Sequence, residues 1–197
     1  TRYDLDRPRM AELLDDQPSY RVDQVWEGLY EQLVTPEEMT NLPKSLRAEL
    51  GESLPMALAE TVVARSDGGD TTKYLWTLAD SEQIETVLMH YRDRSTVCVS
   101  TQAGCAMGCT FCATGQAGYD RNLSVGEIVE QVVVAARNAR DDDRRLSNVV
   151  FMGMGEPLAN FDNTWNAVER LHTDLGLSAR SITVSTVGII PGIKKLT

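Results

Sequence analysis

The sequence predicts an α/β fold in which parallel strands alternate with helices, preceded by a small helical domain. Three runs rich in β-branched residues alternate with two segments whose apolar residues recur at three- and four-residue spacing. The predicted strands are 95–100, 148–155 and 181–186, and the predicted helices are 124–140 and 163–175. Repeated β-α units of this length are typical of a parallel sheet, either open or closed into a barrel.

The helix predicted over 124–140 carries its own start signal. Ser124 precedes the apolar pattern and Glu127 follows three residues later, which is the spacing of a capping box. After the third strand, the run IPGIKKLT begins another helix. Three strands alone would leave an exposed sheet edge and an unclosed core. We therefore expect the sequence to be part of a longer protein, truncated after its third β-α strand.

The first part of the chain has a helical pattern. Segments 8–17 and 20–33 place apolar residues on one helix face, and Thr35 before Pro36 predicts an N-cap with proline in the first turn. We assign residues 1–70 to a small N-terminal helical domain.

A connector and a core complete the predicted organisation. Two strand-like runs, 73–78 and 84–91, are linked by a polar turn and form a strand-containing connector over residues 71–94. The alternating strands and helices occupy residues 95–197, which we assign to the α/β core.

Composition and charge limit the partners that the chain can take. It has 42% hydrophobic and 24% charged residues, with no run long enough to span a membrane and no leader, so we expect a cytoplasmic protein without a membrane partner. The net charge is −10, and residues 1–70 hold 7 Lys or Arg against 15 Asp or Glu. This charge argues against a nucleic-acid partner. Arg144 and Arg145, after three aspartates, are predicted to form a solvated turn at a helix end.

Cysteines carry the strongest chemical signal. All four lie within fifteen residues, and Cys105, Cys109 and Cys112 form a C-x3-C-x2-C pattern directly after a predicted strand. Thiolates are the usual ligands of iron–sulfur clusters, and close spacing lets one loop surround one cluster. Three cysteines would bind three irons of a [4Fe–4S] cluster and leave the fourth iron open to substrate.

Two other functions for the cysteines, a zinc site and a redox dithiol, remain open. Structural zinc needs four ligands, and Cys98 is the available fourth cysteine, although it stands seven residues upstream within a strand. A dithiol redox pair of Cys109 and Cys112 would leave Cys105 unexplained.

The C-x3-C-x2-C pattern with Phe111 before its last cysteine resembles the signature of the radical S-adenosylmethionine (SAM) superfamily. Four longer runs together resemble the RlmN/Cfr family of RNA adenine methyltransferases, and the likeness extends from about Tyr20 to the last residue. These runs are 98–105, 112–128, 148–160 and 182–196. Pro157 is the residue typical of the RlmN branch at its position.

The resemblance implies a fold and two cofactors. The fold is the first part of a radical SAM partial (β/α) barrel with an N-terminal accessory domain. The cofactors are a [4Fe–4S] cluster and SAM, which the cluster cleaves to a 5′-deoxyadenosyl radical. Gly155 and Glu156 match the motif that binds the SAM amino group, and Ser185 matches a further SAM contact. A glutamate among glycines at a strand end suits an ammonium ligand.

Two residues match catalytic positions of the family. Glu85 matches the proposed proton acceptor for carbon 2 of adenine, and its apolar neighbours predict that desolvation raises its pKa. The same strand alternation places Glu85 opposite Ile84 and Thr86, as an outward-facing residue would be. Cys98 matches the cysteine that forms a disulfide with the methyl-carrying cysteine, whereas a strand cysteine without such a match is usually a small buried apolar residue.

The implied reaction is methylation of adenine carbon 2 in ribosomal and transfer RNA, with a flavodoxin-type electron donor. No cysteine follows Cys112, so the methyl-carrying cysteine of the family is not in this sequence, and we expect the fragment to be inactive in methyl transfer. The alternatives are methylation of carbon 8, as in Cfr, and a non-enzymatic metal-binding module.

Overall fold

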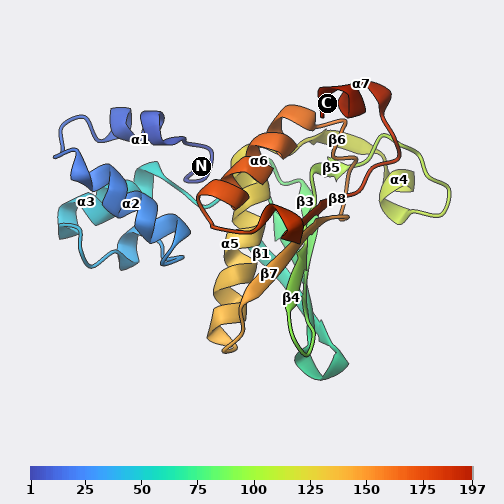
Figure 1. Ribbon diagram of the computed structural model, residues 1–197, viewed down its shortest axis with the longest axis horizontal. Coiled ribbons are helices and arrows are strands. Elements are labelled where there is room, and N and C mark those ends of the chain that lie inside the picture. Colours follow the sequence, from blue (N-terminus) through green and yellow to red (C-terminus); the bar gives the residue numbers. More distant parts are fainter. Residues whose placement is uncertain (197) are drawn as a thin grey trace.

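The computed structural model describes residues 1–196 and contains an α/β sheet layer with a separate group of helices beside it (Figure 1). The helices are α1 (Arg7–Leu13), α2 (Tyr20–Tyr30), α3 (Lys44–Ser53), α4 (Ala113–Ala117), α5 (Val125–Asp141), α6 (Phe161–Thr173) and α7 (Ile190–Lys195). The strands are β1 (Ala59–Ser66), β2 (Thr71–Thr77), β3 (Gln83–His90), β4 (Ser95–Cys98), β5 (Gln102–Gly104), β6 (Tyr119–Asn122), β7 (Leu146–Phe151) and β8 (Ile182–Val184). No helix in this part of the chain is both long and apolar enough to cross a membrane.

Six strands form the main sheet, in the order β1-β2-β3-β4-β7-β8. Strands β1 to β4 pair antiparallel, whereas β4 pairs parallel with β7 and β7 pairs parallel with β8. The α/β prediction is confirmed, and so are the three parallel strands. Parallel pairing brings the carboxyl ends of β4, β7 and β8 to one edge, which is where α/β folds bind ligands.

One strand of this sheet was not predicted. Strand β1 lies within the range 1–70 that the sequence assigns to the helical domain, and it pairs with β2 at the sheet edge. Its residues are almost all exposed, so they lack the apolar alternation by which a half-buried strand is recognised. The division of the chain at residues 70 and 94 stays a prediction.

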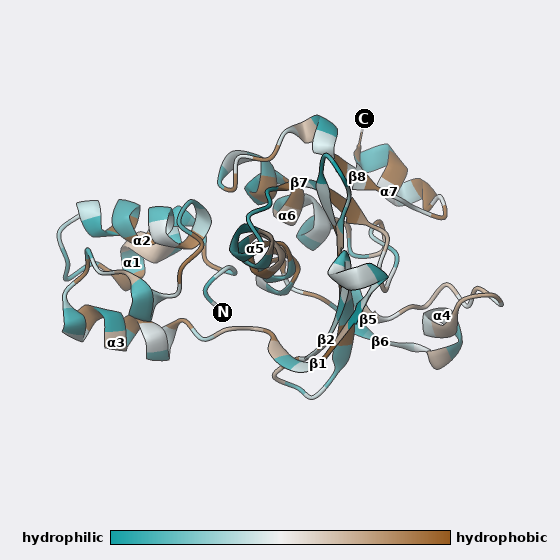
Figure 2. Cartoon of the chain, turned by 90° about the horizontal axis from the view of Figure 1, so that it is seen from below, coloured by the Kyte–Doolittle hydropathy of each residue, from teal (hydrophilic) through white to brown (hydrophobic). Residues whose placement is uncertain are grey.

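Helices cover one face of the main sheet. Figure 2 shows α5 and α6 on one side of the strands, and the loop that carries α4 on the other. Alternate residues of β3 are buried on the covered side, including Ile84 and Thr86. The Thr86 hydroxyl accepts a hydrogen bond from Trp76 Nε1 at 2.9 Å and donates one to Gln131 of α5 at 2.8 Å. The opposite face, which carries Glu85, is only partly covered.

The predicted helix starts are present. Ser124 accepts a hydrogen bond from the Glu127 nitrogen, and the Glu127 carboxylate accepts one from the Ser124 nitrogen, which completes the capping box of α5. Pro36 follows Thr35 at the start of a single 3-10 turn, Pro36–Glu38, in place of a longer helix. Of two further 3-10 turns, Asp67–Gly69 lies between β1 and β2, and Ala179–Ser181 lies between α6 and β8.

Polar contacts fasten the N-terminal helices to α5 and α6. The Arg170 guanidinium donates to the carbonyl oxygens of Tyr3 and Leu5, both at 2.6 Å. The Glu130 carboxylate of α5 is 1% exposed and accepts hydrogen bonds from the backbone nitrogens of Ala57 and Leu58 at 3.0–3.1 Å. The hydrogen bonds of Glu130 fix the segment that joins α3 to β1, and those of Arg170 fix the residues before α1.

Glu130 makes the stability of this junction depend on pH. Burial raises the pKa of the Glu130 carboxyl above its ordinary value of 4.5, against the hydrogen bonds from Ala57 and Leu58, which lower it. The folded chain therefore holds this proton more tightly than the unfolded chain. Between the ordinary and the raised pKa, the free energy of unfolding should fall as pH rises, by at most about 1.4 kcal/mol per pH unit.

Urea unfolding at a series of pH values measures this effect, with Glu130→Gln as the reference because it cannot titrate. Above pH 4.5 the wild-type chain should lose stability relative to the variant. If the free energy of unfolding of the two proteins changes with pH in parallel, Glu130 has the same pKa in the folded and the unfolded chain.

Candidate functional site

The cysteine loop rises from a two-stranded sheet at the carboxyl end of β4. Strands β5 and β6 pair antiparallel, and the Cys105 nitrogen donates to the Gly118 carbonyl at 2.6 Å, which closes the base of the loop. Gly104 has φ +72°, and a Cβ there would lie 2.3 Å from the Gly118 oxygen. Only glycine fits this closure, because a side chain at this position would collide with the Gly118 carbonyl.

Within the loop, the other two cysteines lie on one tight turn. The Cys112 nitrogen donates to the Cys109 carbonyl at 3.1 Å. A Cβ at Gly115 would lie 3.0 Å from the Cys109 nitrogen, so α4 packs directly against this turn. Hydrogen bonds from the backbone at Gly115 and Thr114 lower the pKa of the Cys112 thiol. A thiol that ionises readily suits a metal ligand, because the thiolate is the ligand form.

The three thiols do not form a ready metal site in this structure. Within residues 1–196, no three His, Cys, Asp or Glu side chains are grouped closely enough to hold a metal ion. Cys98, Cys105, Cys109 and Cys112 are all free and partly buried, and Phe111 is 91% exposed. The residues fit an iron–sulfur cluster by their donor atoms and by their short, glycine-rich loop. Their role as ligands stays a prediction.

Glu156 lies at the same sheet edge, in the loop that follows β7. It is 3% exposed, so it is not a solvated turn residue. One carboxylate oxygen accepts from the Leu158 nitrogen at 2.9 Å and from the Thr186 hydroxyl at 2.6 Å, and the other accepts from the Val187 nitrogen at 2.9 Å. Glu156 thereby joins the loops after β7 and β8. A carboxylate has about four acceptor positions, so one remains for a ligand ammonium.

Close backbone contacts hold the Glu156 loop against the residues after β4. Gly155 has φ +99°, and a Cβ there would meet Gln102 at 2.6 Å. The Gln102 side chain accepts from the Glu156 nitrogen at 2.8 Å and donates to Asn122 at 2.8 Å. The Ser100 hydroxyl donates to the Glu85 carbonyl at 2.6 Å and accepts from the Met154 nitrogen at 3.0 Å. These side chains connect the cysteine loop, the Glu156 loop and β3.

The sequence-based interpretation missed Gln102, Ser100 and Thr186 as parts of this site. Gln102 and Ser100 are at most 2% exposed, although they are polar and follow a strand. A run of polar residues between a buried strand and the first cysteine is the signal that could have identified the first two. Nothing in the local pattern marks Thr186.

Ser185 lies at the end of β8. Its nitrogen donates to the Phe151 carbonyl at 3.4 Å, which continues the parallel pairing of β7 and β8 to the sheet edge. The residue is exposed, so its side chain is available to a ligand at this edge. Its contact with SAM stays a prediction.

Glu85 and Cys98 lie on the face of the sheet opposite α5. Cys98 is directly across from Val87 on β3, and Glu85 is two residues from Val87 on the same face. Burial raises the pKa of the Cys98 thiol, so it is held as the neutral thiol. Glu85 forms an ion pair with Lys73 of β2, with Nζ and Oε1 2.7 Å apart.

The predicted desolvation of Glu85 is wrong. Its side chain is 43% exposed and Lys73 is 49% exposed, so the carboxylate is hydrated and paired with a cation. The apolar neighbours in the sequence, such as Ile84, point to the other face of the sheet. The alternation that places Glu85 opposite Ile84 and Thr86 is confirmed.

Comparisons with known proteins agree with this geometry. Residues 99–196 match the radical SAM superfamily. The chain is 53% identical to a probable dual-specificity RNA methyltransferase RlmN of Rhodococcus erythropolis, over 91% of this chain and 52% of that protein. It is 50% identical to a protein of the same description from Chloroflexus aurantiacus, over 98% of this chain and 54% of that protein. The chain thus spans about half the length of the curated relatives it matches.

A solved structure is also similar. The crystal structure of a radical SAM methyltransferase from Sphaerobacter thermophilus matches with a TM-score of 0.94 and 49% sequence identity. The match covers 98% of this chain and 59% of that one. The arrangement of helices and strands is therefore that of a radical SAM methyltransferase over almost the whole chain.

Proposed function

This chain belongs to the radical SAM superfamily and, within it, to the RlmN family, and on that premise we propose that it forms the cofactor-binding part of an enzyme that methylates carbon 2 of adenine in ribosomal and transfer RNA. One observation carries the proposal. The C-x3-C-x2-C loop and the Glu156 loop both lie at the carboxyl edge of β4, β7 and β8, and a hydrogen bond from the Glu156 nitrogen to Gln102 joins the Glu156 loop to the strand that leads into the cysteine loop.

Each predicted residue has a place in this proposal. Cys105, Cys109 and Cys112 would hold the [4Fe–4S] cluster. The residues between these cysteines are mostly exposed, so an electron donor such as a flavodoxin-type protein has access to the loop. When bound, the cluster and SAM supply the radical chemistry, and the protein supplies position. Gly155 lets the backbone approach Gln102, so that Glu156 is fixed with an acceptor position left for the SAM amino group.

Ser185, Glu85 and Cys98 complete the proposed set. Ser185 offers its hydroxyl to SAM from the end of β8. Glu85 accepts the proton from adenine carbon 2, and its ion pair with Lys73 holds the carboxylate in place on the open face of the sheet. Cys98 forms a disulfide with the methyl-carrying cysteine as the sulfur–carbon bond between that cysteine and the product breaks, and the product carbon takes the electron pair and a proton. The partly buried neutral thiol of Cys98 is less reactive than a thiolate toward oxidants in solution.

Nucleoside mass spectrometry tests the proposed reaction. Because the 197-residue chain lacks the methyl-carrying cysteine, the full-length gene product that contains this chain should be expressed, in a bacterial host whose own carbon-2 methyltransferase gene is deleted. We expect 2-methyladenosine to return to the ribosomal and transfer RNA, and an empty vector serves as the control. A product of 8-methyladenosine would support the Cfr-like alternative, and the absence of both products would contradict an RNA methyltransferase.

A further inference from the structure

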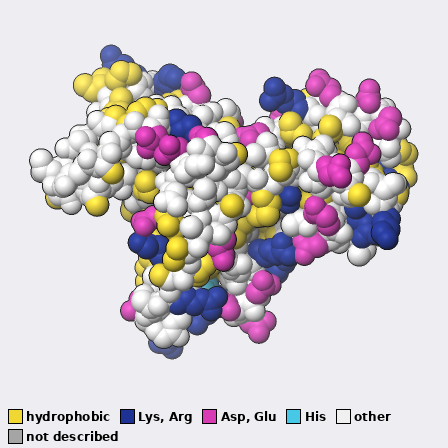
Figure 3. Space-filling view, turned by 180° about the vertical axis from the view of Figure 1, so that it is seen from behind, with side chains coloured by type: hydrophobic (Ala, Val, Ile, Leu, Met, Phe, Trp, Pro, Cys, Tyr) yellow, Lys and Arg dark blue, Asp and Glu magenta, His cyan; other side chains and the backbone are white. Residues whose placement is uncertain are grey.

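A second charged site lies at the opposite end of the sheet from the cysteine loop. Four arginines line a hollow of about 400 Å³ between the β3–β4 turn and the residues that lead into β7. We call this the arginine groove, and its arginines are Arg92, Arg94, Arg144 and Arg145. In the space-filling view, Lys and Arg side chains lie at the lower end of the molecule with Asp and Glu side chains beside them, where the strand turns and the end of α5 lie (Figures 1 and 3).

The arginine groove is basic although the chain has a net charge of −10. Among the residues that line the hollow, Asp93 is the one carboxylate, and it lies 3.4 Å from Arg94. The aspartates that precede Arg144 do not line the groove, and Asp142 is directed to His90 at 3.6 Å. Two of the four arginines are thus paired with carboxylates, Arg94 with Asp93 and Arg144 with Asp70, and the other two keep their positive charge uncompensated by an ion pair.

The arginines of the groove differ in whether their side chains are already bonded to the rest of the protein. Arg144 donates to the Tyr91 carbonyl at 3.1 Å and contacts Asp70 at 3.3 Å, which fixes its position. Arg92 and Arg145 are exposed and make no hydrogen bond or ion pair with the rest of residues 1–196. The Arg92 guanidinium is therefore free for a ligand in the groove, beside the oriented Arg144, and the Arg145 guanidinium is free in the adjoining hollow.

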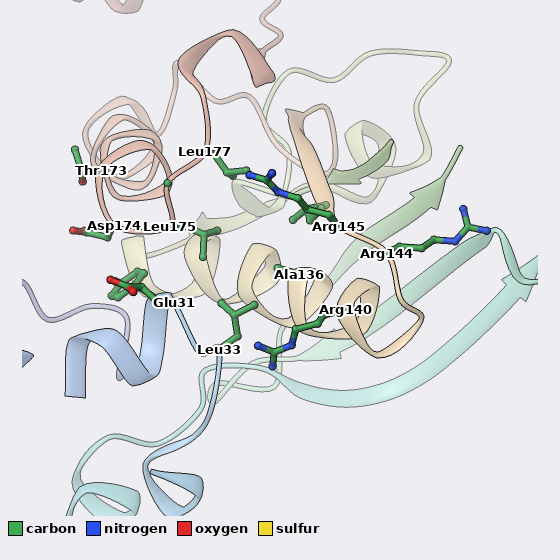
Figure 4. A pocket seen from close by; sticks show the side chains of 13 residues that line it. Glu31, Leu33, Ala136, Arg140, Arg144, Arg145, Thr173, Asp174, Leu175 and Leu177 are labelled. Atoms are coloured by element: carbon green, nitrogen blue, oxygen red, sulfur yellow. The ribbon is translucent and has the colours of Figure 1, made fainter. Parts of the chain in front are cut away.

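A neighbouring hollow extends the same surface. A cavity of about 570 Å³ lies between α5, the end of α6 and the start of β7, and it shares Arg144 and Arg145 with the arginine groove. Figure 4 shows Arg145 directed toward Leu177 in this cavity, whereas Arg144 is directed away from it. Arg140 lines the same cavity from α5 and donates to the Gln32 carbonyl at 2.6 Å. The two hollows meet at the Arg144–Arg145 pair.

We propose that the arginine groove binds backbone phosphates of RNA. The planar guanidinium group donates two parallel hydrogen bonds to phosphate oxygens and stays charged at any physiological pH. Four such groups, two of them without an ion pair, suit a polyanion. This proposal rests on the proposed function, because RNA is the polyanion that the reaction implies. The structure has Arg144 and Arg145 exposed just after the end of α5, as the sequence predicts, and the proposal gives these solvated residues a ligand.

The position fits a substrate that spans the sheet. The six residues of β7 cover about 20 Å from the arginine groove to the edge with the cysteine loop. A double-stranded-RNA-binding domain can span about 16 base pairs of an RNA helix, and a helix of that many base pairs is longer than this separation between the groove and the cysteine loop. One RNA can therefore hold a base at the carboxyl edge while its backbone reaches the groove. The groove would then contribute affinity and register without reading sequence.

Fluorescence anisotropy with a labelled transfer RNA transcript tests the proposal on the 197-residue chain. The test variant Arg92→Gln/Arg145→Gln removes two charges that have no internal partner. The matched control, Arg65→Gln/Arg180→Gln, removes the same charge at two exposed arginines that line neither hollow. Thermal unfolding of all three proteins checks that they fold alike.

We expect the test variant to bind the transcript about tenfold more weakly, with the slope of log affinity against log salt reduced by about 2. The control variant should change the affinity less than about twofold. Equal loss in both variants would show a net-charge effect alone, and unchanged binding in the test variant would overturn the groove.

Two further outcomes separate this inference from the proposed function. If the wild-type chain does not bind the transcript at all, both RNA as the partner and the groove as its site are wrong. If polyglutamate at the same charge concentration competes as well as unlabelled transcript, the groove is a site for acidic proteins and the commitment to RNA is overturned.

Discussion

Replacement of Cys109 by alanine should abolish the iron–sulfur cluster. The variant removes one of three thiolates, and the remaining two cannot hold the cluster in the exposed loop. After anaerobic reconstitution with iron and sulfide, the wild-type chain should absorb near 400 nm, roughly the region of charge transfer from sulfur to iron. The Cys109→Ala chain should show no such absorbance.

Cys98→Ala is the matched control for this experiment. Cys98 lies at the end of β4 with a neutral thiol, outside the loop, so its loss should leave the reconstituted absorbance unchanged. Equal loss of absorbance in both variants would indicate a four-cysteine site, and the open iron would then be excluded.

Glu156→Gln should weaken SAM binding by about 1.5–3 kcal/mol, or roughly ten- to a hundredfold in affinity. The variant keeps the size of the side chain but replaces one acceptor oxygen with a donor. Glu156 is buried, and the Leu158 and Val187 nitrogens both donate to its carboxylate, so one of them would lose its partner. Calorimetry on the reconstituted chain measures the affinity.

Thr186→Val separates the ligand role of Glu156 from its structural role. This variant removes one hydrogen bond to the Glu156 carboxylate and keeps the charge. It should lower the free energy of unfolding by about 1 kcal/mol and change the SAM affinity little. If both variants weaken SAM binding equally, Glu156 acts through the loops that it joins, and not on the SAM amino group.

Much of the fold could be predicted from the sequence because its elements carry local signals. The capping residues Ser124 and Glu127 mark the start of α5, and the β-branched runs mark β4, β7 and β8. Strand β1 could not be predicted, since it is exposed on both faces at the sheet edge. Strands β5 and β6 are three and four residues long, which is too short for a periodic pattern.

The part of the site that could be predicted is the part marked by neighbouring residues in the sequence. The cysteine spacing and the glycines around Glu156 are local, and the structure places them at one sheet edge. The environment of Glu85 depends on Lys73, twelve residues earlier on a neighbouring strand, and the environment of Glu156 depends on Thr186, thirty residues later. Such partners follow from strand pairing, which no local pattern specifies.

Metal and sulfide analysis of the purified, anaerobically reconstituted chain tests the central claim most directly. A [4Fe–4S] cluster on Cys105, Cys109 and Cys112 predicts about four iron atoms and four acid-labile sulfides per chain. The expected zinc content is negligible. Zinc at about one atom per chain, without labile sulfide, would contradict the account and identify a structural metal site in its place.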